Sequence, residues 1–171
     1  VGTGMSSKSF RIPKEEEDPE DSFAPTIPAA QREAFVAACR GFTSRLEASL
    51  NEVPLNVVDD VGASLLHWAC FKRKVDIVKM LLERGIDATL RTTTDSQTAL
   101  HWACAGGSVH VLHALYQAGV NNYADVDQRG YQALHVAVQN GHYNLVHYLC
   151  LKNVEVDARD NENVTPLHWA A

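Results

Sequence analysis

One short phrase recurs along the chain, and its spacing constrains the fold more than any other feature. The phrase reads Leu-His-X-Ala, and its histidines are His67, His101, His135 and His168, at intervals of 34, 34 and 33 residues. A fixed period of about 33 residues is typical of a repeat protein, in which each unit buries its apolar face against the next unit. We therefore expect a stack of similar helical units that holds a partner.

Each unit also carries signals that begin and end helices. A Ser or Thr three positions before the histidine caps a helix start in three units, and Gln132 takes that place in the third. A second helix, such as residues 75–82, is then expected to end at Gly85 or Gly119, with Asn153 in the matching position of the third unit. We place the extra residue of each 34-residue interval in the turns that project from the helices.

The phrase and its period resemble the T-P-L-H-x-A core of ankyrin repeats. The resemblance implies an all-α ankyrin-repeat solenoid of helix-turn-helix units with β-hairpin-like turns. Two short helices expected at residues 31–40 and 43–51 form an atypical first unit, as terminal repeats often do. The resulting division is a degenerate N-terminal repeat at 29–58, repeats at 59–92, 93–126 and 127–159, and a truncated repeat at 160–171.

Composition narrows the kinds of partner. The formal net charge is −6, with an acidic stretch at residues 15–21, and no basic stripe indicates nucleic-acid binding. Residues 1–28 are expected to be a disordered acidic tail, because they contain too few apolar side chains to offset the entropy of ordering. No apolar run reaches the ~18–20 residues of a membrane span. We expect a monomeric cytoplasmic segment that makes no membrane contact of its own.

The histidines and cysteines admit a structural and a chemical interpretation. The pairs His67/Cys70 and His101/Cys104 have the i, i+3 spacing of metal ligands on a helix, but the period indicates core positions that bond to neighbouring repeats. We expect no metal, no cofactor and no catalytic site in these residues. The cysteines are all expected to be reduced and buried: Cys39, Cys70, Cys104 and Cys150.

The tryptophans of the phrase have two possible roles. They could pack between helices, or they could form a partly exposed aromatic ladder along the concave groove, interrupted by Val136. The turn tips and the ends of the first helices also face the groove in an ankyrin unit. The candidate partner-binding residues are Trp68, Phe71, Lys72, Gln97, Trp102, Tyr131, Gln139 and Asn140.

A finer resemblance concerns the repeated L-H-W-A. Residues 98–103 and 165–171, with Gln139-Asn140-Gly141-His142, are similar to the ankyrin domains of DHHC-type protein palmitoyltransferases. In that family the domain is N-terminal and cytosolic, binds extended peptide motifs of substrate proteins, and precedes membrane helices. The resemblance therefore implies a substrate-recruiting domain of a membrane S-acyltransferase, at the cytosolic face of an intracellular membrane. The alternative is a freestanding adaptor or scaffold without enzymatic activity.

The family's groove residues transfer only in part. Trp102 matches a groove tryptophan, whereas Lys72 stands where the family has an Asn, which puts the partner motif in doubt. The D-H-H-C motif is absent, so any enzymatic role would belong to residues beyond this chain. Because the fourth repeat lacks its second helix, we expect the natural protein to continue past Ala171. Apolar stretches of about 20 residues around a Cys-rich segment would then follow, whereas an adaptor would end after a capping repeat.

Overall fold

The computed structural model describes Phe23 and residues 26–170, and this part of the chain is helical. It contains no strand there beyond an isolated antiparallel bridge between Val58 and Ser64. The helices follow one another in pairs: α1 (Ala29–Arg40), α2 (Thr43–Ser49), α3 (Leu65–Phe71), α4 (Val75–Glu83), α5 (Ala99–Gly106), α6 (Val109–Gln117), α7 (Ala133–Gln139), α8 (Tyr143–Leu151) and α9 (Pro166–Ala170).

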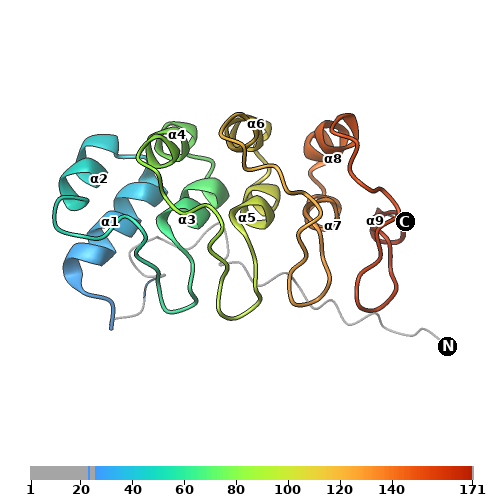
Figure 1. Ribbon diagram of the computed structural model, residues 1–171, viewed down its shortest axis with the longest axis horizontal. Coiled ribbons are helices and arrows are strands. Elements are labelled where there is room, and N and C mark those ends of the chain that lie inside the picture. Colours follow the sequence, from blue (N-terminus) through green and yellow to red (C-terminus); the bar gives the residue numbers. More distant parts are fainter. Residues whose placement is uncertain (1–22, 24–25, 171) are drawn as a thin grey trace.

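The helices form two layers (Figure 1). The first helices of the pairs, α1, α3, α5, α7 and α9, lie side by side in one layer, and α2, α4, α6 and α8 lie in the other. Long turns project from the first layer on the side away from the second. Each inner helix packs against its neighbours in the same layer, as α3 does against α1 and α5. This arrangement confirms the all-α solenoid.

The local signals begin and end the helices as expected. Helices α3, α5 and α7 start directly after Ser64, Thr98 and Gln132, each of which forms a reciprocal cap with the histidine three residues later. The outer helices end at residues with positive φ: Gly85 at 78°, Gly119 at 83° and Asn153 at 55°. The left-handed conformation turns the chain toward the next unit, and glycine and asparagine adopt it at least cost.

The extra residues of the two 34-residue intervals between histidines lie in different kinds of loop. The turn that closes between Thr92 and Gln97 is one residue longer than the matching turn between Asp59 and Ala63, so the first insertion lies in a projecting turn as predicted. The prediction is wrong for the second insertion, because the turn from Asp127 to Tyr131 has the shorter length. The extra residue lies in the loop 120–126 after α6. This loop buries the Tyr123 ring, which leaves its hydroxyl without a hydrogen-bond partner.

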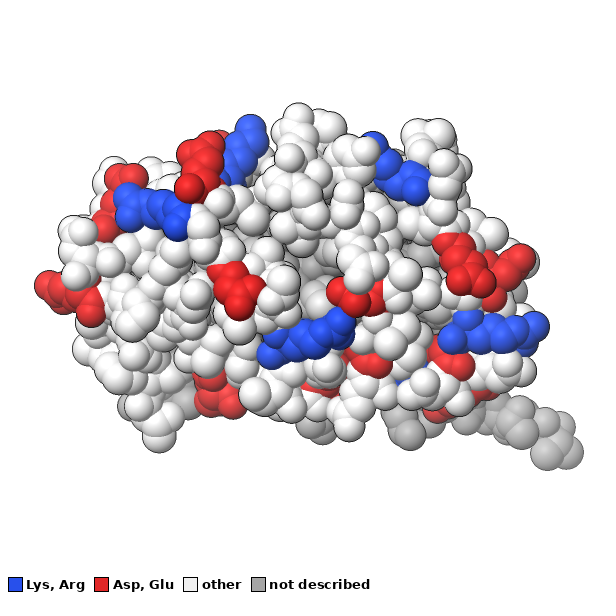
Figure 2. Space-filling view, in the orientation of Figure 1, with Lys and Arg blue, Asp and Glu red and all other residues white. Residues whose placement is uncertain are grey.

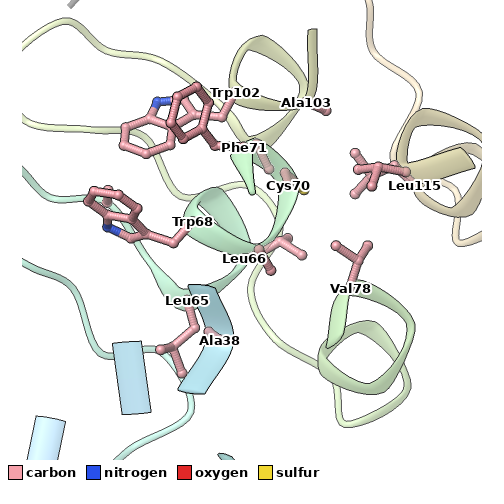
Figure 3. Close-up of a cluster of buried hydrophobic side chains, with 14 of the residues drawn as sticks. Ala38, Leu65, Leu66, Trp68, Cys70, Phe71, Val78, Trp102, Ala103 and Leu115 are labelled. Atoms are coloured by element: carbon pink, nitrogen blue, oxygen red, sulfur yellow. The ribbon is translucent and has the colours of Figure 1, made fainter. Parts of the chain in front are cut away.

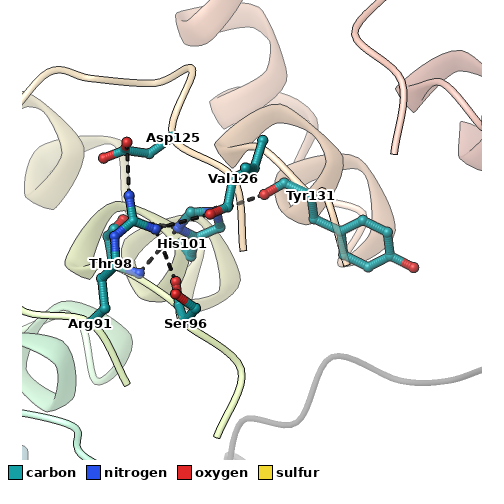
Figure 4. A network of polar contacts seen from close by, with 7 residues as sticks. All are labelled: Arg91, Ser96, Thr98, His101, Asp125, Val126 and Tyr131. Atoms are coloured by element: carbon teal, nitrogen blue, oxygen red, sulfur yellow. Dashed lines mark hydrogen bonds and ion pairs between the residues drawn. The ribbon is translucent and has the colours of Figure 1, made fainter. Parts of the chain in front are cut away.

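A polar network joins the first and second repeats (Figure 4). The Arg91 guanidinium donates to the carbonyl oxygens of Ser96 and Val126, at 3.1 and 2.9 Å, and pairs with the Asp125 carboxylate at 2.8 Å. The Arg91 bonds fix the loop after α6 against the turn before α5. At the next boundary, between the second and third repeats, Nε2 of His142 donates to the Ala105 carbonyl at 2.9 Å.

The cysteines depart from the expectation at one position. All four are free thiols, and Cys39, Cys70 and Cys104 are buried. Burial raises the pKa of the Cys39 and Cys104 thiols to about 12 and raises the pKa of Cys70 as well. Cys150 is exposed, because it lies on the outer surface of α8 and not on the face that packs inward.

Packing begins before the first helix. Phe23 and Ile27, which lie in the segment expected to be a disordered tail, are both buried in the hydrophobic core. The Arg32 side chain donates to the Ile27 carbonyl at 3.3 Å. The acidic stretch at residues 15–21 lies outside the described residues.

Candidate partner-binding site

The histidines of the phrase join each repeat to the next. Nδ1 of His67 accepts a hydrogen bond from the backbone N–H of Ser64 at 3.2 Å, so the ring is neutral and carries its proton on Nε2. That proton is donated to the Gln97 carbonyl, at 3.2 Å, in the turn of the following repeat. His101 donates in the same way to the Tyr131 carbonyl at 2.8 Å. The histidines are therefore structural.

Burial keeps these rings uncharged. It lowers the pKa of His67 from 6.5 to about 4, because the charged imidazolium would lose its hydration, and the bond to Gln97 opposes the shift only in part. Burial likewise lowers the pKa of His101 and His135. Within the described residues, no group of three or more His, Cys, Asp and Glu side chains is placed to hold a metal ion.

The tryptophans of the first two repeats are interior residues. Trp68 and Trp102 are each 1% exposed, and their indole rings pack edge to face at 5.4 Å between centroids. Each indole N–H has an acceptor: Trp68 donates to Asp59 at 2.8 Å, and Trp102 donates to Gln97 at 3.0 Å. Trp68 and Trp102 therefore have the first of the two roles considered from sequence, which is packing between helices. An exposed aromatic ladder is absent at these two positions, because the rings are held between neighbouring helices and turns.

The tryptophans lie on the face of the inner helices that is turned away from the second layer. In Figure 3 both indoles point away from Val78 and Leu115, which belong to the second layer. Phe71 packs on Trp102 at 6.0 Å and is itself buried. These three rings form the floor beneath the ends of α3 and α5.

The third repeat interrupts this arrangement, as the sequence indicated. Val136 replaces the tryptophan, and Oδ2 of Asp127, which matches the indole acceptor Asp59, is buried without a hydrogen-bond partner. Tyr131 does not reach Trp102; it stacks on His135 at 5.8 Å and packs edge to face on Trp169 at 5.9 Å. The candidate residues therefore fall into two aromatic groups on either side of Val136.

The polar candidates lie nearer the surface. Lys72 follows α3, is partly exposed, and holds its ammonium 5.4 Å from the centre of the Phe71 ring. Asn140 is exposed and donates from its side chain to the Val136 carbonyl at 2.8 Å. Oε1 of Gln139 is buried without a hydrogen-bond partner. Lys72 and Asn140 are thus the candidates that a partner can reach without moving a packed ring.

Sequence reasoning missed the roles of Asp59 and Phe23 in this region and assigned a different role to Gln97. Asp59 is buried and accepts from two backbone N–H groups besides the indole, yet desolvation raises the pKa of its carboxyl. Gln97 was expected to face a partner, but it is buried and holds Trp102. Phe23 packs on Trp68 at 4.9 Å and on Phe35 at 5.1 Å. The available signal for Phe23 was its apolar neighbour Ile27, four positions later.

Charge is distributed without a dominant sign on the face shown in Figure 2. Acidic and basic side chains are mixed across it, and several of opposite sign lie next to one another between areas of uncharged surface. Across the described residues, no helix combines the length and apolarity needed to cross a membrane.

The family of this chain follows from the repeats and from comparison with known proteins. The family described as ankyrin repeats, in three copies, matches residues 34–124, 90–160 and 121–171, so the chain belongs to the ankyrin-repeat family. Such repeats form modules that bind proteins or peptides. The chain is also 40% identical over 139 residues to "Palmitoyltransferase akr1" of Schizosaccharomyces pombe, which fits the N-terminal ankyrin domain of DHHC palmitoyltransferases. The match covers 80% of this chain and 22% of the length of that protein.

Proposed function

We propose that this chain is the cytosolic, substrate-recruiting ankyrin domain of a membrane protein S-palmitoyltransferase. The observation that carries the proposal is the 40% identity to a palmitoyltransferase over 139 residues. The recruiting role accords with the ankyrin array, since arrays of this family bind proteins or peptides. The chemistry of acyl transfer would belong to other parts of such a protein.

The gene of origin provides the first test. Its coding sequence after Ala171 is expected to encode several apolar stretches of about 20 residues around a Cys-rich segment with the D-H-H-C motif. A stop codon after one capping repeat would instead establish the freestanding adaptor.

The partner in this proposal is an extended peptide segment in the groove. The segment would lie over the floor made by Trp68, Phe71 and Trp102 and would contact Lys72 and Asn140 at the surface. Gln97, Gln139 and Tyr131 would shape the groove from below or from its side. An apolar segment with an acidic or amide group near Lys72 suits this surface, since Lys72 supplies a cation and Asn140 an amide oxygen.

A binding experiment tests the surface residues directly. Peptides selected from a displayed library against the full chain would be titrated against Lys72→Ala and Asn140→Ala variants. We expect each variant to weaken binding by about fivefold or more while the thermal midpoint stays unchanged. Lys79→Ala is the matched control, because Lys79 is an exposed lysine on the outer helix α4. Equal affinity of Lys72→Ala, Asn140→Ala and Lys79→Ala would exclude this surface.

A further inference from the structure

Phe23 occupies an aromatic pocket that the array itself provides. Its ring lies 4.9 Å from Trp68, with 65° between the planes, and 5.1 Å from Phe35. It is 5% exposed. The residue precedes α1 in sequence, yet it contacts α3 of the following repeat, so its ring bridges two units.

Phe23 extends the aromatic floor by one member. The contacts run from Phe35 through Phe23 and Trp68 to Trp102 and Phe71, with each pair of neighbouring centroids 6.0 Å apart or closer. Phe35, Trp68, Trp102 and Phe71 all belong to α1, α3 or α5. Phe23 lies outside every helix, so it can leave the row without breaking a helical hydrogen bond.

The pocket faces the side where a partner would lie. The indole of Trp68 points away from the second helical layer (Figure 3), so the ring that covers it lies on the groove side. Ile27, four positions after Phe23 in the sequence, is also buried and helps to anchor Phe23. Phe23 and Ile27 thus place two apolar side chains against the array from outside its helices, as a bound peptide places its anchors in a groove.

We propose that Phe23 is an intramolecular ligand of the groove, and that a partner segment binds by placing an aromatic side chain in the Phe35–Trp68 pocket after displacing Phe23. The inference rests on the proposed function, because it takes the groove to be the recruiting surface, and it adds an anchor subsite and a competitor. Aromatic pairs at these centroid distances add to the free energy of burial, which favours an aromatic anchor over an aliphatic one. The chain therefore tunes its own affinity, since every partner competes with a tethered side chain.

The test uses the full chain and a defined probe. A fluorescein-labelled peptide with the sequence of residues 18–28, DPEDSFAPTIP, is titrated against the wild-type chain and the Phe23→Ala variant. We expect the variant to bind the peptide at least about tenfold more tightly than wild type, because its pocket is vacant. A second peptide with Ala at the Phe23 position should bind neither protein.

Two controls keep the test interpretable. Phe42→Ala removes an exposed phenylalanine elsewhere in the first unit and should bind the peptide as weakly as wild type does. If Phe23→Ala does not fold, Phe23→Leu keeps most of the buried volume and should show the same ranking with a smaller difference.

The opposing results are distinct. A folded Phe23→Ala protein that does not bind the peptide would show that Phe23 is a fixed part of the core. Equal binding by wild type and variant would place the peptide elsewhere on the surface. Either result would overturn the proposal that a partner competes with Phe23 for the pocket. The recruiting function is decided separately, by the effects of Lys72→Ala and Asn140→Ala on the binding of a selected partner.

Discussion

The indole N–H of Trp102 donates to the side-chain oxygen of Gln97 at 3.0 Å, and this bond replaces the one that the first repeat makes to an aspartate. In the first repeat the acceptor for Trp68 is Asp59, which begins the projecting turn. Thr92 begins the matching turn of the second repeat, and its side chain is too short to accept a hydrogen bond from the Trp102 indole. The acceptor has therefore moved to the residue that closes the turn.

The first prediction concerns this bond. Gln97→Leu should lower the free energy of unfolding by about 1–3 kcal/mol, because the buried indole N–H of Trp102 loses its acceptor. Urea unfolding monitored by circular dichroism measures the change, and Gln128→Leu at an exposed turn position is the control. In combination with Trp102→Phe, which removes the donor, Gln97→Leu should cost less than it does alone. Strictly additive effects would contradict the coupling.

The second prediction is a loss of stability in mild acid. The folded chain holds the pKa of His67 at about 4 against 6.5 in model peptides and lowers the pKa of His101 and His135. Below pH 6.5 the unfolded chain therefore binds protons that the folded chain does not bind. The free energy of unfolding should be highest above that pH and should fall until about pH 4, by up to about 1.4 kcal/mol per pH unit for each such histidine.

Urea midpoints between about pH 7 and about pH 5 check this dependence. His67→Gln should reduce the slope, because it removes a ring whose pKa is lowered by burial. A midpoint that is constant over this range would mean that the buried rings do not resist protonation.

The third prediction concerns the thiols. In the native chain one cysteine, Cys150, should react quickly with a disulfide reagent, because the other three are buried and their pKa values are raised. Mass spectrometry of the alkylated peptides identifies the site, and denaturant should expose the remainder. Cys150→Ser should abolish the fast phase. Rapid modification of Cys70 or Cys104 would show that the inner helices open readily.

The fourth prediction concerns the last helix. Helix α9 packs against α7 without a second-layer helix over it, and Leu167 is 72% exposed. Amide hydrogen exchange should therefore be fastest after about Asp160 and slowest in α3 and α5, whose residues are buried on both sides. Protection in α9 equal to that in α5 would require a covering contact, such as a second copy of the chain.

The sequence predicts the repeat architecture because the period is carried by residues with fixed backbone roles. Ser64 and Thr98 begin helices, and Gly85 and Gly119 end them, in any context that keeps the helix pair. The structural role of His67 and His101 follows from the same regularity. The second insertion was misplaced because a spacing between two histidines does not say which of the intervening loops is longer.

The site was less predictable because it depends on which side chains cover one another. A Leu-His-Trp-Ala phrase is compatible with an exposed or a buried indole. Contacts with the turn residues Asp59 and Gln97 and with Phe23 keep the indoles buried. The replacement of one acceptor by another is a tertiary event that no local pattern encodes. The contact of Phe23 with α3 is likewise non-local, since 45 residues separate it from Trp68.

The interruption at Val136 has a physical consequence for how the array responds to its surroundings. Between the first and second repeats the joint is aromatic, through Trp68 and Trp102, and includes the Arg91 ion pair, whereas His101 and His142 join the second and third through hydrogen bonds to carbonyl oxygens. Apolar contact weakens on cooling, while an exposed ion pair weakens as salt is added. Cold and high ionic strength should thus both loosen the first joint more than the second, which makes a short array of similar units unequal in its response to its environment.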